Sequence, residues 1–135
     1  MNTKSLFAVL TGFVTLMLSG FLFYEVIFKS YFAKLMESMG DCFLKEPPIL
    51  PLIIAHVCFS VILLMLLRSK NVSTFMGGIQ ASWLLVILVM VWYDAWSFTY
   101  IPQMTLTIAI IDVAVNSTCS LLGAGVMGWV LGKHK

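Results

Sequence analysis

The sequence predicts an all-α fold, an integral membrane bundle of four helices with a short amphipathic helix between the first two spans. Of the 135 residues, 61% are hydrophobic and only 10% are charged. A typical soluble domain is about half apolar and roughly a quarter charged, and a soluble chain of this length could not bury so much apolar surface. Four separate stretches reach the ~20 apolar residues that cross a bilayer. The length allows one domain, 1–135.

The first predicted span covers about 5–28 and is a retained membrane helix rather than a cleaved signal peptide. Its apolar run from Leu6 to Phe28 exceeds the ~7–15 residues of a signal core. The next stretch, about 29–40, is predicted to form an amphipathic helix along the outer membrane surface, because its apolar residues recur at helical spacing. Its simplest role is to cap the bundle, and the alternative is a lid or a docking surface.

The other three predicted spans cover about 49–67, 74–96 and 105–131. The second follows Pro47 and Pro48, which suit a helix start because the first turn needs no internal donors. Ser73 or Thr74 is expected to cap the third span. The fourth follows Pro102 after a short connection.

Positive charge predicts the orientation, because Lys and Arg are retained on the cytoplasmic side of short loops. One side carries Lys4, Arg68, Lys70, Lys133 and Lys135. The other side carries Lys29, Lys34 and Lys45, mixed with acidic residues. We therefore predict a multi-pass protein of the inner (plasma) membrane with both termini in the cytoplasm.

Composition and motifs argue against several functions. A net charge of +2 without a basic cluster argues against nucleic acid binding. The three cysteines, Cys42, Cys58 and Cys119, are too widely spaced for a disulfide framework or a CxxC metal site. No nucleophile elbow, phosphate loop or Cys/His pair at catalytic spacing is present. We therefore expect no enzyme, no cofactor and no metal site.

The candidate functional residues are polar groups inside the predicted spans. An ionisable group there costs about 2.5–3.5 kcal/mol on insertion scales, so its presence suggests a role. The candidates are Glu25, His56, Asp94, Asp112 and Asn116. Counted along the helical rise, all lie in the outer half of the membrane, with Glu25 about 5 Å deep and His56 and Asp112 about 10 Å deep. This predicts an outward-facing polar pocket for a small molecule or a lipid headgroup.

Three other interpretations stay open. In a scaffold or accessory subunit, Asp112, Asn116 and His56 bond one another and hold the helices together. A divalent metal site would use His56 and the carboxylates, although no H-x-x-x-H or E-x-x-H spacing is present. A proton- or cation-coupled small transporter would use Asp112 to carry the proton.

Glycines mark the expected contacts between helices. Gly123, Gly125, Gly128 and Gly132 crowd the fourth span, and the last two have the G-x-x-x-G spacing that lets helices approach closely. Packing within the bundle explains them, and a homodimer through glycine-rich faces is the alternative. The expected partners are the lipid bilayer, a second copy of the chain and another membrane protein.

Short motifs occur along the chain: Phe21-Leu22-Phe23-Tyr24, Glu46-Pro47-Pro48, Asp112, and Gly125-Val126-Met127-Gly128-Trp129 with Gly132-Lys133. With these motifs the chain resembles, over nearly its whole length, a family of small uncharacterised bacterial inner-membrane proteins with four spans. The resemblance implies the four-span architecture and brings no activity with it. It also adds Tyr24 and Glu46 to the residues of the candidate pocket.

Overall fold

A computed structural model describes residues 3–40 and 48–133 of the chain. These residues form the helices α1 (Thr3–Phe21), η1 (Leu22–Ile27), α2 (Lys29–Met39), α3 (Ile49–Ser69), α4 (Phe75–Tyr100) and α5 (Leu106–Lys133). Four helical segments are long and apolar enough to cross a membrane: Thr3–Ile27, Ile49–Ser69, Phe75–Tyr100 and Leu106–Lys133. The predicted all-α membrane bundle is therefore confirmed, and α2 is the short amphipathic helix that the sequence predicts between the first two spans.

The first span does not remain α-helical to its end. Leu22–Ile27 forms a π-helix, and the Phe28 N–H donates to the Phe23 carbonyl, five residues back, at 2.8 Å. Such turns are rare, and they occur often at functional sites because they change the direction of the side chains that follow. Helix α2 then ends at Gly40, whose φ of 56° is a conformation that glycine adopts without steric cost.

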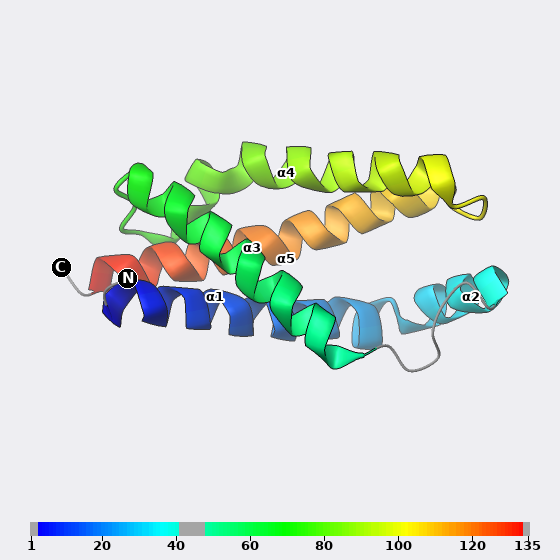
Figure 1. The fold of residues 1–135 in the computed structure, drawn as a ribbon, viewed down its shortest axis with the longest axis horizontal. Helices are drawn as coiled ribbons and strands as arrows, with labels where there is room; N and C mark the ends of the chain where they lie inside the picture. The colour runs from blue at the N-terminus through cyan, green and yellow to red at the C-terminus, as the bar shows by residue number, and fades with distance from the viewer. Residues whose placement is uncertain (1–2, 41–47, 134–135) are drawn as a thin grey trace.

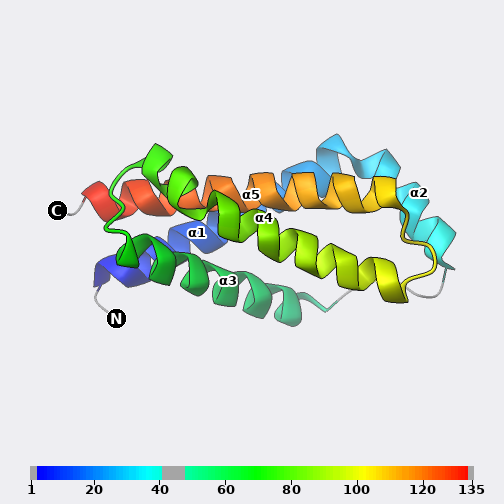
Figure 2. The ribbon, with the colours of Figure 1, turned by 90° about the horizontal axis from the view of Figure 1, so that it is seen from above.

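Helix α5 lies at the centre of the bundle, between α1 and α4, while α3 crosses these helices obliquely (Figure 1). Both termini lie at one end, and α2 lies at the opposite end (Figures 1 and 2). The core sits in the half nearest the termini, around Leu63, Leu67, Val86 and Met127. Large apolar side chains also cover the outside of the bundle, as Met65 does at 68% exposure. A hydrocarbon environment explains this pattern, because so many exposed apolar side chains would be unfavourable in water.

The ends of the spans carry the expected local signals. Thr74 caps α4, because its side chain accepts a hydrogen bond from the Gly77 N–H at 3.0 Å. That helix continues to Tyr100, beyond the expected end near 96. At the same end of the bundle, the Arg68 guanidinium donates to the Ser5 hydroxyl at 3.1 Å and joins α3 to the start of α1.

The glycines of α5 bring its backbone against both neighbouring helices. Gly123 lies against Leu16 and Gly12 of α1. Gly128 lies against the backbone of Thr74, and Gly132 against that of Ser73. The G-x-x-x-G pair is thus used inside one chain, where it lets the start of α4 approach closely. A homodimer would need a different face from the one that these glycines form.

Candidate functional site

Three polar side chains meet between the π-helix and α5. The Tyr24 hydroxyl donates to Asp112 Oδ1 at 2.7 Å. The Asn116 amide nitrogen donates to the Tyr24 hydroxyl and to Asp112 Oδ2, both at 2.8 Å. Each of these side chains contacts the other two, so the triad satisfies most of its own hydrogen bonds away from water.

Local geometry brings the triad together. Asp112 and Asn116 lie four residues apart on α5 and therefore share one face of the helix. Tyr24 lies in the middle of the π-helical turn, and its ring packs on that of Phe32 of α2, with centroids 4.5 Å apart. The triad therefore joins the end of the first span to α5 and also supports the amphipathic helix.

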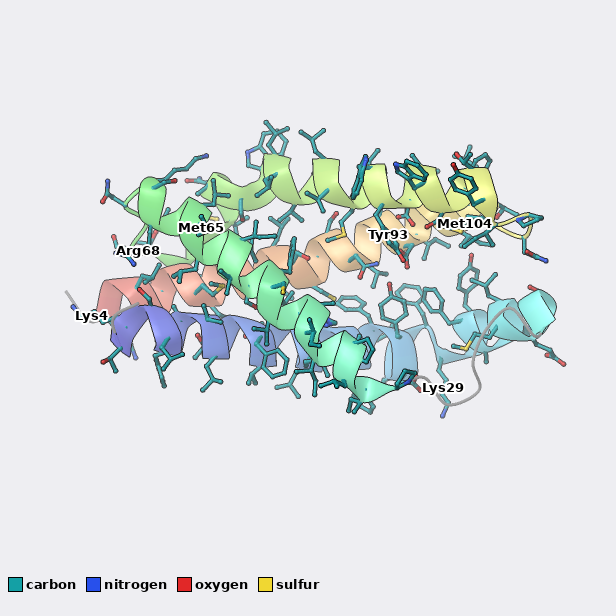
Figure 3. The ribbon with its side chains drawn as sticks, in the orientation of Figure 1. Lys4, Lys29, Met65, Arg68, Tyr93 and Met104 are labelled. Carbon is teal, nitrogen blue, oxygen red and sulfur yellow. The ribbon has the colours of Figure 1, made fainter. Side chains whose placement is uncertain are left out.

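Asp94 of α4 extends this cluster. Its side chain is only 3% exposed, and its carboxyl group lies near that of Asp112. Asp94 Oδ1 has no hydrogen-bond partner among the described residues. Because an ionised carboxylate only accepts hydrogen bonds, a bond between the two groups requires that one of them holds a proton. Figure 3 shows the neighbourhood, where Tyr93 marks this part of α4.

A cavity of about 540 Å³ opens beside the triad. Four of the predicted pocket residues line it: Tyr24, Glu25, His56 and Asn116. Most of the remaining lining is apolar, and it comes from α1, α3, α4 and α5: Leu16, Met17, Gly20, Phe21, Leu52, Ala55, Phe59, Met90, Cys119 and Ser120. The arrangement suits an apolar molecule with a polar end, because few polar groups converge on one part of an apolar cavity.

The other predicted pocket residues do not line this cavity. Asp94 lines a second, almost wholly apolar cavity of about 640 Å³ between α4 and α5, and Asp112 lies between the two cavities without lining either. Glu46 falls outside the described residues. The polar residues that the sequence predicts at one depth therefore do not form a single pocket. Some line the first cavity, Asp94 lines the second, and Asp112 lines neither.

His56 is held by its own helix. Its Nδ1 lies 2.8 Å from the Leu52 carbonyl oxygen, one turn earlier on α3. Among the described residues, the hydrogen bonding predicted for His56, Asp112 and Asn116 is present between the last two, whereas His56 bonds to Leu52. The ring lines the same cavity as Tyr24 and Glu25, from a different helix.

The described residues contain no group of three or more His, Cys, Asp or Glu side chains placed to hold one metal ion. Cys58 and Cys119 are free thiols, and Cys42 falls outside the described residues. The π-helical turn is the feature of this site that the sequence analysis missed, since no composition signal marks it. No protein-family model, no curated protein and no solved structure matches the chain.

Proposed function

We propose that this protein binds a small amphiphilic molecule or a lipid in the cavity that all four spans line. The observation that carries the proposal is the cavity of about 540 Å³ with Tyr24, Glu25, His56 and Asn116 in its lining. Small-molecule sites commonly measure about 300–1,000 Å³ and combine apolar walls with a few polar groups that fix orientation. Ionisable side chains inside a membrane also mark functional sites more often than structural ones.

Accessibility from outside tests the pocket. In a chain whose three cysteines are replaced by alanine, His56→Cys is expected to react with a membrane-impermeant thiol reagent added to intact cells. A second substitution, Gly20→Leu, adds a side chain from another helix that lines the cavity. It should slow the reaction at least about tenfold, which corresponds to ~1.4 kcal/mol. The rate is measured by mass spectrometry of the purified chain.

Ile62→Cys is the matched control on the same helix. Ile62 is 48% exposed on the outside of the bundle and does not line the cavity, so lipid should shield it from a water-soluble reagent. The pocket is disproved when His56→Cys is inaccessible from both sides of the membrane, or when it reacts no faster than Ile62→Cys.

The proposed location is a bacterial inner membrane with both termini in the cytoplasm. Lys4 and Arg68 lie at the end of the bundle that holds the termini, and Lys29 lies at the other end (Figure 3). The excess of Lys and Arg at the end with the termini supports this orientation. In this orientation the cavity, with Glu25 and His56, faces the outside.

Reporter fusions test the orientation. A reporter enzyme that is active only outside the membrane is expected to be inactive when it is fused after Lys135, because moving the cationic end across the membrane is unfavourable. The same reporter inserted at Gly40 should be active. Activity of the fusion at Lys135 contradicts the orientation and would place the cavity on the cytoplasmic side.

A proton-linked transport step is the second candidate, and the carboxyl pair favours it. Asp94 and Asp112 bring two carboxyl groups near each other, and a carboxyl group can take up and release a proton. Tyr24 and Asn116 bond to Asp112 and also line the cavity. A ligand that displaces either side chain therefore changes the hydrogen bonds that Asp112 accepts. A transporter needs such a link between its ligand and its carboxyl groups.

A further inference from the structure

We propose that the cavity selects a ligand with a protonated amine on an apolar body, because three of the polar groups that line it have hydrogen-bond acceptors left for a ligand. This inference rests on the binding function proposed above and names the chemical class of its ligand. Three groups carry it: the Glu25 carboxylate, the His56 ring and the Asn116 amide oxygen. For His56 and Asn116, the atom available to a ligand follows from the hydrogen bonds that the side chain already makes.

His56 presents an acceptor because of its bond to Leu52. A backbone carbonyl oxygen only accepts hydrogen bonds, so the Nδ1 that lies 2.8 Å from it carries the ring hydrogen. In the neutral ring, Nε2 then has a lone pair and no hydrogen. The ring lines the cavity, and the atom it has left for a ligand is this acceptor.

Asn116 presents an acceptor for a similar reason. Its amide nitrogen donates to Tyr24 and to Asp112, and an amide has only two N–H hydrogens to give. The Tyr24 hydroxyl has already given its single hydrogen to Asp112. What these two lining residues retain for a ligand are lone pairs on oxygen.

Charge points the same way. Among the described residues that line the cavity, Glu25 carries a negative charge and none is Lys or Arg. An anionic headgroup such as a phosphate or a carboxylate is normally bound by Arg, Lys or backbone N–H donors, and it would meet acceptors here instead. A primary ammonium group supplies three donors and the opposite charge. Phe21 and Phe59 also line the cavity, and aromatic rings attract cations.

Three eight-carbon probes test the ligand class on the full chain in phosphatidylcholine vesicles. The reporter is the rate at which Ala55→Cys, a lining position, reacts with a thiol reagent after the native cysteines are replaced by alanine. Octylammonium is expected to slow the reaction at least about tenfold at saturation, octanol less, and octanoate not at all. Glu25→Gln should weaken the protection by octylammonium about tenfold and leave that by octanol unchanged, because only the charge is removed.

Glu37→Gln is the matched control, since Glu37 is an exposed acidic residue of α2 that does not line the cavity, and protection should persist in it. Protection by octanoate equal to that by octylammonium overturns the amine preference while leaving the pocket in place. Failure of all three probes with a reactive Ala55→Cys also overturns it. An Ala55→Cys that no reagent reaches removes the pocket itself and, with it, the proposed binding function.

The amine could belong to a free molecule or to a lipid headgroup, and the vesicles distinguish the two. Phosphatidylethanolamine carries a primary ammonium group, whereas the quaternary nitrogen of phosphatidylcholine has no hydrogen to donate. With no probe added, slower labelling of Ala55→Cys in vesicles that contain phosphatidylethanolamine identifies the headgroup as a ligand. Equal labelling in both vesicles, together with protection by octylammonium, identifies a free amine.

Discussion

Replacing Gly128 with leucine is expected to destabilise the bundle by about 3 kcal/mol, the upper range for an overpacked core. A Cβ atom at this position would meet the Thr74 carbonyl oxygen, the Val72 side chain and the Gly78 Cα. Two of these three atoms belong to the backbone, so they cannot move aside by changing a rotamer. The start of α4 must therefore separate from α5, and the close helix contact in this half of the bundle is lost.

Gly20→Leu is the control for this prediction. It makes the same substitution in a membrane helix, but a Cβ atom at Gly20 meets nothing within 4 Å. The free energy of unfolding can be measured by titrating the detergent-solubilised chain with SDS and following tryptophan fluorescence. The control should stay within about 1 kcal/mol of the native chain, since surface changes seldom exceed this. Equal stability of the two variants would contradict the close contact between α4 and α5.

The architecture could be predicted from the sequence because the bilayer imposes it. A hydrocarbon layer requires about 20 apolar residues per helix and leaves little choice of backbone structure. The start of α3 after Pro48 and the cap of α4 at Thr74 follow equally from local chemistry. The amphipathic spacing of 29–40 was enough to predict α2, since its apolar and polar residues separate onto two faces only in a helix.

The arrangement of the candidate site could be predicted only in part. The helical rise gives the depth of a residue in the membrane, but its direction around the helix axis depends on how the helices pack. The sequence predicts a similar depth for Asp94 and His56, yet they line different cavities. Depth alone could not separate them, because α3 crosses the other helices obliquely (Figure 1).

The role of Tyr24 had the weakest sequence signal. Its depth near the end of the first span is typical of an interfacial aromatic residue, and only the resemblance drew attention to it. The π-helical turn changes the direction of its side chain, so that its hydroxyl meets Asp112 at 2.7 Å. A π-turn has no composition signature of its own, so neither the turn nor this contact follows from the spacing of residues along an ideal α-helix.

Replacing Asp112 with leucine is expected to cost about 2–3 kcal/mol of unfolding free energy, because it leaves donors of Tyr24 and Asn116 without their acceptor. Asp112→Asn keeps a carbonyl oxygen for Tyr24 but loses the second oxygen, which accepts from Asn116. The Asn116 amide can still donate to the Tyr24 hydroxyl, so this variant should cost about 1 kcal/mol, less than the leucine. Unfolding in SDS measures both variants in the same way.

The same pair of variants separates the three proposed roles of the triad. A scaffold whose polar groups only join helices should tolerate Asp112→Asn in every respect, including the molecules that copurify with it. A binding protein should keep the protection of Ala55→Cys by octylammonium, because Asp112 does not line the cavity. A proton-linked transporter should keep that binding but lose transport, since an amide at this position cannot exchange a proton with Asp94. If Asp112→Asn unfolds as readily as Asp112→Leu, the hydrogen bond from Tyr24, which the amide oxygen preserves, does not stabilise the bundle, and this contradicts the structural role of the triad.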